Sequence, residues 1–190
     1  MLLLVGLGNP GSNSVNNRHN IGFKIIDSVN THFKLSKQKP KFKGLLTTGN
    51  IESKKIYAIK PLTFMNNSGT AIKELIDYFK IDAKDVFVFH DDMDIDFGKI
   101  KAKFGGGSAG HNGIDSIDKF IGKDYSRVRI GIGHPKQKNK VNNHVLEDFK
   151  EDEEEKIKEI AENIVKLIPT LIEKKIDLFS SKVNQNLNWI

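Results

Sequence analysis

The sequence predicts an α/β fold, a single domain in which strands alternate with helices in layers and the C-terminal helix is amphipathic. Short apolar runs, typical of buried strands, alternate along the chain with longer segments whose apolar residues recur every three to four positions, as on one face of a helix. The 190 residues contain no internal repeat and no linker that would divide them, so residues 1–190 are expected to form one domain.

The first half of the chain is expected to supply three strands and two helices. In order, the expected elements are a strand at 2–7 ending in a tight glycine-rich turn, a helix at 20–33, a basic surface loop at 34–43, and strands at 45–51 and 55–59. The next helix carries Ala71, Leu75 and Phe79 on one face, and Ser68 is its expected N-cap.

The second half begins with an apolar strand at 86–89, which delivers His90, Asp91 and Asp92 at its C-terminal end. The following elements are a strand at 99–104 with alternating lysines on one face, a glycine-rich loop at 105–113 opening a helix, a strand at 127–133, and a Lys-rich loop at 134–143 that is a candidate mobile flap. The amphipathic C-terminal helix starts with an acidic turn at 151–155, and Pro169 is expected to kink or end it.

Composition narrows the class of protein. The chain is 38% hydrophobic and 28% charged, and no apolar run approaches the roughly 20 residues that span a bilayer. The absence of cysteine excludes disulfides, a thiol nucleophile and thiolate metal sites, and it fits the reducing cytoplasm. A net charge of +6 makes an anionic partner plausible, although a surface rich in lysine gives the same figure.

Three local sequence patterns each match a known kind of functional site. The turn Gly6-x-Gly8-x-x-Gly11 matches a dinucleotide-binding fingerprint, but it lacks an acidic residue at the end of a second strand, since Asp27 lies in the expected helix. The segment 106–110 matches a nucleophile elbow in which Ser108 would serve a serine esterase, with His134 or His144 as its base. A metal cluster is the third pattern, drawn from His90, Asp91, Asp92, Asp94 and His111.

A fourth constellation is distributed along the chain. Arg18-His19-Asn20 opens one expected helix, Met65-Asn66 follows a proline-containing loop, Asp91 ends a strand, and His111-Asn112 opens another helix. Strand ends and helix starts converge on one edge of an α/β sheet, where such proteins build their sites. The pattern therefore favours an active site over a set of unrelated polar residues.

Six segments together resemble bacterial-type peptidyl-tRNA hydrolase in order and spacing. They are Val5-Gly-Leu-Gly-Asn-Pro-Gly11, Arg18-His-Asn-Ile-Gly22, Lys60-Pro-Leu-Thr-Phe-Met-Asn66, His90-Asp-Asp-Met-Asp94, Gly105-Gly-Gly-Ser-Ala-Gly-His-Asn-Gly113 and Arg127-Val-Arg-Ile-Gly-Ile-Gly-His-Pro135. The resemblance covers roughly residues 1–149, and Val183-Asn184 is similar to the family's terminal motif. It implies an α/β fold with a twisted mixed β-sheet flanked by helices. It also implies hydrolysis of the ester bond in N-blocked peptidyl-tRNA by a cytoplasmic monomer, without a cofactor, a metal ion, a membrane or an obligate protein partner.

The resemblance also implies roles for individual residues. His19 would be the general base that activates water, and Asp91 would orient the His19 imidazole. Asn9 matches the position that distinguishes N-blocked from free aminoacyl-tRNA. Substrate-binding positions correspond to Ser14, Phe64, Met65, Asn66, His111 and Asn112, and positions that contact tRNA phosphates correspond to Lys101, Lys103 and Arg129.

The chain departs from the family pattern at Ser14 and Asn17, where the family usually has Tyr and Thr, so any stacking by that tyrosine is lost. Lys136 also replaces a common glycine in the expected flap.

Negative charge that develops on the ester carbonyl oxygen needs hydrogen-bond donors, and the Asn66 amide or backbone N–H groups near Asn66 and Asn112 are the candidates. A non-catalytic RNA-binding protein and the Ser108 esterase remain the alternatives.

Overall fold

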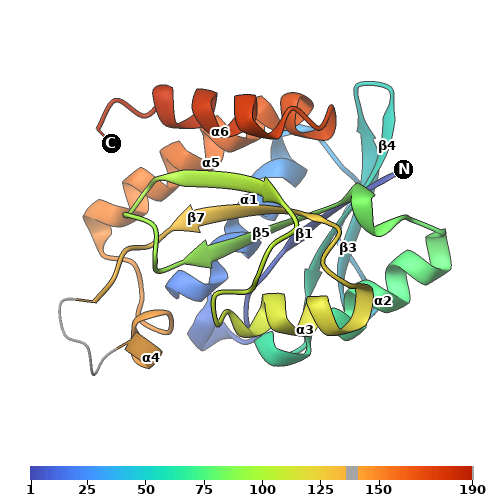
Figure 1. The fold of residues 1–190 in the computed structure, drawn as a ribbon, viewed down its shortest axis with the longest axis horizontal. Coiled ribbons are helices and arrows are strands. Elements are labelled where there is room, and N and C mark those ends of the chain that lie inside the picture. The colour runs from blue at the N-terminus through green and yellow to red at the C-terminus, as the bar shows by residue number, and fades with distance from the viewer. Residues whose placement is uncertain (136–140, 190) are drawn as a thin grey trace.

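The computed structural model describes residues 1–135 and 141–189, and a seven-stranded sheet forms its centre (Figure 1). The strands are β1 Leu2–Gly6, β2 Lys39–Lys41, β3 Gly44–Ile51, β4 Lys54–Pro61, β5 Val86–Asp92, β6 Ile100–Phe104 and β7 Ser126–Gly131. Their order across the sheet is β2-β3-β4-β1-β5-β7-β6. The four central strands run parallel, and β2, β3 and β6 pair antiparallel, so the sheet is mixed as predicted.

Helices cover both faces of the sheet. They are α1 Ile21–His32, α2 Ser68–Phe79, α3 Asn112–Ile121, α4 Val141–His144, α5 Glu151–Ile172 and α6 Ile176–Gln185. Helices α1, α5 and α6 pack on one face and α2 and α3 on the other (Figure 1). This is the layered single-domain α/β architecture that the alternating pattern predicts.

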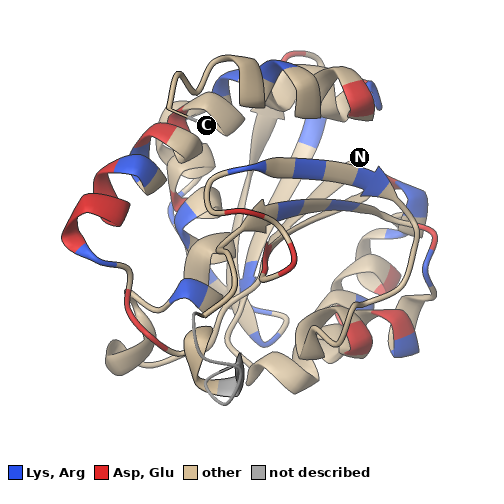
Figure 2. Ribbon diagram, turned by 60° about the vertical axis from the view of Figure 1, so that its left-hand side comes forward, with Lys and Arg blue, Asp and Glu red and all other residues tan. Residues whose placement is uncertain are grey.

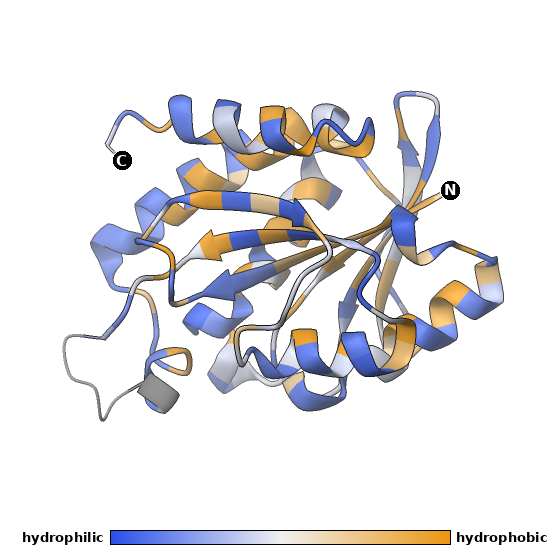
Figure 3. Ribbon diagram, in the orientation of Figure 1, coloured by the Kyte–Doolittle hydropathy of each residue, from blue (hydrophilic) through white to orange (hydrophobic). Residues whose placement is uncertain are grey.

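Alternation along the strands explains why two cores form. Leu2 and Leu4 of β1 belong to the core under α1 and α5, whereas Leu3 and Val5 belong to the core under α2 and α3. Successive side chains of a strand point to opposite faces, so an entirely apolar strand fills both cores. The helix surfaces turned toward the sheet are correspondingly hydrophobic (Figure 3).

The C-terminal helix α6 closes the β6 edge of the sheet. The Ile100 backbone N–H donates to Asn184 Oδ1 at 2.9 Å, and Asn184 Nδ2 donates back to the Ile100 carbonyl at 2.8 Å. The Ala102 backbone N–H donates to Ser180 Oγ at 2.8 Å. Side chains of a helix thus satisfy backbone groups of an edge strand that would otherwise be open to pairing with another chain.

Several sequence-based expectations need correction. Ser68 is the first residue of α2 rather than its N-cap, and its hydroxyl donates to the Met65 carbonyl at 2.9 Å. Helix α5 continues past Pro169 to Ile172, so the proline lies within the last turn instead of ending the helix. The basic segment 34–43 is not entirely a loop, because strand β2 forms there; Pro40 is tolerated since β2 is an edge strand.

Much of the expected flap at 134–143 lies outside the described residues, which resume at α4. Among the described helices, none combines the length and the apolar composition that a transmembrane segment requires.

Candidate active site

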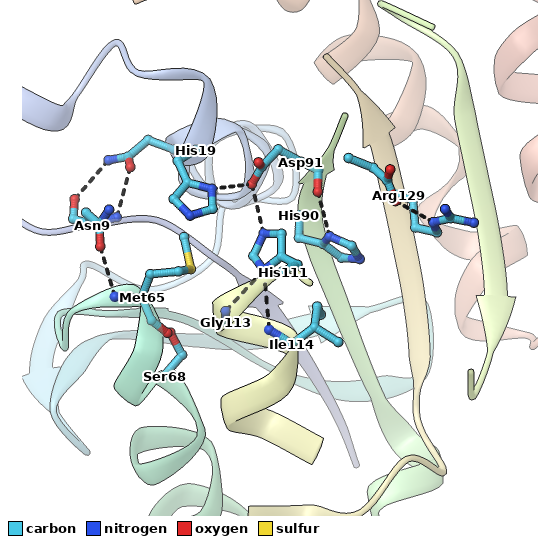
Figure 4. Close-up of polar contacts among 12 residues, drawn as sticks. Asn9, His19, Met65, Ser68, His90, Asp91, His111, Gly113, Ile114 and Arg129 are labelled. Atoms are coloured by element: carbon cyan, nitrogen blue, oxygen red, sulfur yellow. Dashed lines mark hydrogen bonds and ion pairs between the residues drawn. The ribbon is translucent and has the colours of Figure 1, made fainter. Parts of the chain in front are cut away.

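The candidate site lies at the edge of the sheet where the parallel strands end. Asp91 belongs to the C-terminal end of β5, and Asn9 follows β1. His19 comes from a short 3-10 turn, Arg18–Asn20, that leads directly into α1, and His111 is the N-cap of α3. The structure therefore brings together side chains from four separate junctions between elements (Figure 4).

The contact at the centre joins His19 to Asp91. His19 Nδ1 lies 2.7 Å from Asp91 Oδ1, and both residues are buried, at 6% and 2% exposure. Because an ionised carboxylate can only accept, Nδ1 carries the proton and Nε2 is left with its lone pair. His19 and Asp91 also line a cavity of about 410 Å³, so the arrangement can present a basic nitrogen to a molecule bound there.

A second histidine shares the same oxygen. His111 Nε2 lies 3.0 Å from Asp91 Oδ1, while His111 Nδ1 accepts from the backbone N–H groups of Gly113 and Ile114 at 3.1 and 3.3 Å. The two amide donors fix the tautomer, so the proton of His111 must sit on Nε2 and point at Asp91 (Figure 4). Sequence reasoning assigned His111 to substrate binding; the structure engages both ring nitrogens within the chain.

Charge in the cluster is concentrated on Asp91. Burial alone would raise the pKa of this carboxyl, but His111 and His19 together hold it well below its usual range. Behind them, burial lowers the pKa of His90 to about 3, with a further contribution from His111. His90 is therefore a neutral residue near pH 7, and its Nδ1 donates to the Asp91 carbonyl at 2.8 Å.

The backbone of His19 is held by a segment distant in the sequence. The His19 N–H donates to the Val145 carbonyl at 2.8 Å, and the Arg18 N–H donates to the Glu147 carbonyl at 3.0 Å. The Arg18 side chain pairs with Glu153 at 2.8 Å, near the start of α5. No local sequence pattern predicts these contacts, and they were not expected from the sequence.

Asn9 belongs to a network of carboxamide bonds. Asn9 Oδ1 accepts from the Met65 backbone N–H at 2.9 Å, while the Asn9 backbone N–H and carbonyl bond to the Asn20 side chain at 2.8 and 2.9 Å. Since Asn9 Oδ1 is occupied, the group that Asn9 retains for another partner is the Nδ2 donor. Asn20 fixes this loop and was not assigned a role from the sequence.

The other predicted substrate-binding residues are placed unequally. Asn112 lines the His19 cavity, Asn66 and Phe64 are exposed, and Met65 is buried. Within the part of the chain that the structure describes, the Asn66 and Asn112 side chains have no hydrogen-bond partner. Ser14 lies in the turn after Gly11 and is not among the residues that line the cavity.

The predicted basic residues share one face of the sheet. Lys101 lies opposite Arg129 across β6 and β7, and Lys103 lies opposite Arg127. Basic positions accordingly lie side by side on two neighbouring strands (Figure 2). Arg129 pairs with Asp92 at 2.7 Å, whereas Arg127 is buried and bonds to Asp118 and the Gly107 carbonyl. Burial lowers the pKa of Lys103, and the positive charges of Arg129 and Arg127 lower it further. An anion bound beside Lys103 would relieve that repulsion.

The alternative sites find less support. Ser108 Oγ accepts from the Gly110 N–H at 3.3 Å, while His134 bonds to Asp94 and His144 to the Ile132 carbonyl, so neither histidine acts as the base of Ser108 in this arrangement. Asp27, considered for a dinucleotide site, instead pairs with Lys60 at 2.6 Å.

The metal cluster considered as an alternative is also not assembled, because Asp92 and Asp94 bond to Arg129 and His134. The ligand atoms of His19, Asp91 and His111 do lie within 4.8 Å of one another. The hydrogen bonds to Asp91, at 2.7 and 3.0 Å, are shorter than the roughly 3.3 Å between two ligands of a tetrahedral ion. These side chains are arranged to bond to one another.

Comparisons with known proteins show the family to which the chain belongs. The model of the family described as "Peptidyl-tRNA hydrolase" matches residues 3–189. The chain is 72% identical to the peptidyl-tRNA hydrolase of Pelagibacter ubique, over 97% of this chain and 99% of that one. It is 44% identical to the enzyme of Bartonella henselae, over 97% and 96% of the two chains.

Among solved structures, the crystal structure of peptidyl-tRNA hydrolase from Acinetobacter baumannii superposes with a TM-score of 0.90 at 34% identity, and the match covers 97% of this chain and 94% of that one. Family model, sequence identity and fold thus converge over nearly the whole length. The chain belongs to the peptidyl-tRNA hydrolase family.

Proposed function

We propose that the chain hydrolyses the ester between peptide and tRNA with His19 as general base and Asp91 as its counter-ion. The observation that carries the proposal is the 2.7 Å bond between His19 Nδ1 and Asp91 Oδ1, which leaves Nε2 to take a proton. Water attacks the ester carbonyl carbon while its proton passes to Nε2. The carbon–oxygen bond to the ribose then breaks, and the imidazolium returns the proton to the leaving ribose oxygen.

Asparagine side chains are the proposed donors to the developing oxyanion. The backbone N–H groups of Gly113 and Ile114 at the start of α3 already donate to His111, and the Met65 N–H donates to Asn9. These backbone groups are therefore not free to stabilise the carbonyl oxygen. We assign the oxyanion contact to the exposed carboxamides of Asn66 and Asn112, since a neutral amide suits a substrate whose side chains vary.

Asn9 provides a basis for selecting N-blocked substrates. Because Asn9 Oδ1 accepts from the Met65 N–H, the Asn9 side chain offers its Nδ2 as a hydrogen-bond donor. The acyl carbonyl of an N-blocked substrate can accept this hydrogen bond, whereas a free ammonium group is itself a donor and cannot. We expect N-acetylaminoacyl-tRNA to be hydrolysed about 10²-fold faster or more, in kcat/KM, than the same aminoacyl-tRNA with a free amine. The measurement is release of deacylated tRNA. Binding of both without release would instead leave a non-catalytic RNA-binding protein.

The basic face of β6 and β7 is the proposed tRNA surface. Replacing Lys101 or Lys103 by alanine should weaken tRNA binding irrespective of sequence and reduce the slope of log Kd against log salt by about one unit for each lost phosphate contact. Lys166→Ala, an equal change of charge at an exposed position of α5, is the control. If Lys166→Ala reduced the slope as much as the Lys101 and Lys103 variants do, tRNA would bind to a different surface.

We also propose that the chain acts as a monomer, because hydrogen bonds within the chain connect His19 and His111 to Asp91 and Asn9 to Met65. Its substrate class assigns the activity to the cytoplasm, where tRNA takes part in translation.

A further inference from the structure

A second cavity, larger than the one beside His19, lies on the other side of Asn9. Its volume is about 630 Å³, and its walls come from the loop after β1, from α1 and α5, and from the ends of β3 and β4. Helices α1 and α5 lie on the same face of the sheet (Figure 1). We call this cavity the α1–α5 groove and define it by Asn9, Val15, Asn20, Phe23, Leu62 and Ile157. Asn9 and Asn20 join it to the site that contains His19.

The register of the sheet places the groove opposite the tRNA surface. Val5 pairs with both Ile59 and Val88, so the end of β1 lies between the ends of β4 and β5. Leu62 directly follows β4 on one side of the loop after β1, and Asp91 belongs to the end of β5 on the other. Beyond Asp91 come β7 and then β6, which carry the basic face. The edge of the sheet therefore presents the basic face, the His19–Asp91 pair, Asn9 and the α1–α5 groove in that order.

The groove lacks the character of a phosphate site. Its apolar rim includes Val15 and Leu62, which are 57% and 41% exposed. Of the three lysines that line it, Lys24 pairs with Glu154 at 3.2 Å and Lys60 with Asp27 at 2.6 Å, so two of the three positive charges are already offset. An uncharged, largely apolar occupant fits this lining better than an anion does.

We propose that the α1–α5 groove binds the peptide arm of the substrate and prefers an apolar side chain at about the third residue from the ester. The inference rests on the proposed function, because that function places the reacting ester beside His19. The peptide and the ribose lie on opposite sides of the ester, so they leave the site in different directions. With the ribose arm on the basic face, the peptide arm runs across Asn9 toward Leu62.

The reach of an extended peptide sets the position. Neighbouring strands are about 4.8 Å apart, so the two intervals from β5 to β4 span roughly 10 Å. An extended chain advances about 3.3–3.6 Å per residue, which places the third residue beside Leu62. A single N-acetylated amino acid ends before it reaches the groove.

The test compares substrates that differ within the groove. Two N-acetyltetrapeptidyl-tRNAs carry leucine or serine at the third residue from the ester, and N-acetylaminoacyl-tRNA is the short reference. The wild-type chain is expected to prefer the leucine substrate by about 10-fold in kcat/KM, mainly through KM. Leu62→Ala and, separately, Val15→Ser should reduce that preference to less than about 3-fold. Leu178→Ala, at a similarly exposed leucine of α6, should retain it.

The outcomes separate this inference from the proposed function. Equal kcat/KM values for the leucine and serine substrates in the wild-type chain, or an undiminished preference in both groove variants, would overturn the groove assignment while the reference substrate is still cleaved. Failure to cleave all three substrates would instead count against the proposed function. Both rim residues are partly exposed, and the melting temperature of each variant shows whether its fold is preserved.

Discussion

Replacing His19 by alanine is expected to lower kcat for N-acetylaminoacyl-tRNA by about 10²- to 10⁴-fold, the range that general bases typically contribute. The imidazole is the group whose unprotonated nitrogen faces the reaction in the proposed mechanism, because its other nitrogen is bonded to Asp91 at 2.7 Å. The KM should change much less, since the phosphate contacts proposed for Lys101 and Lys103 lie on β6 and not on the turn that carries His19. Steady-state kinetics with purified substrate separates the two constants.

Ser108→Ala is the informative companion variant. Ser108 lines the same cavity as His19, and a serine esterase would depend on its hydroxyl. Under the proposed mechanism Ser108→Ala should retain activity within about 10-fold, because the loss is confined to a hydroxyl that accepts a local backbone bond. Loss of turnover in Ser108→Ala together with its survival in His19→Ala would reverse the assignment.

Most of the fold could be predicted because each element carries its own pattern. The apolar run at the N-terminus, the alternation of Lys101 and Lys103 with core residues, and the helical spacing in α1 depend on burial that a local window reveals. The errors lie at boundaries. Ser68 has the chemistry of an N-cap but uses its hydroxyl one step inside the helix, and β2 exists because β3 offers it a partner, which a local pattern does not show.

The candidate site was foreseeable in its residue types and less so in its bonding. Strand ends and helix starts predict that His19, Asp91 and His111 gather at one edge. The sequence does not tell which nitrogen of His111 faces Asp91, because that depends on two backbone amides of α3. The support of His19 by Val145 is likewise a contact across 126 positions of the chain, and it requires the fold to be known.

Asp91→Asn is expected to lower kcat by about 10²-fold, and the size of the loss distinguishes charge from orientation. In a serine-protease triad the equivalent change costs about 10⁴-fold because the amide turns its nitrogen toward the histidine and selects the wrong tautomer. Here both His19 and His111 donate to Asp91 Oδ1. A carboxamide oxygen can accept both bonds, so the variant should keep the tautomer and lose the negative charge.

His111 is what holds that oxygen in place. Its Nδ1 accepts from Gly113 and Ile114, so its Nε2 must donate and would oppose an amide nitrogen turned toward it. The double variant Asp91→Asn/His111→Ala, compared with His111→Ala, should therefore lose more than Asp91→Asn does from the wild type, approaching about 10⁴-fold. Equal losses in the two backgrounds would show that His111 does not orient residue 91, and that charge alone accounts for its effect.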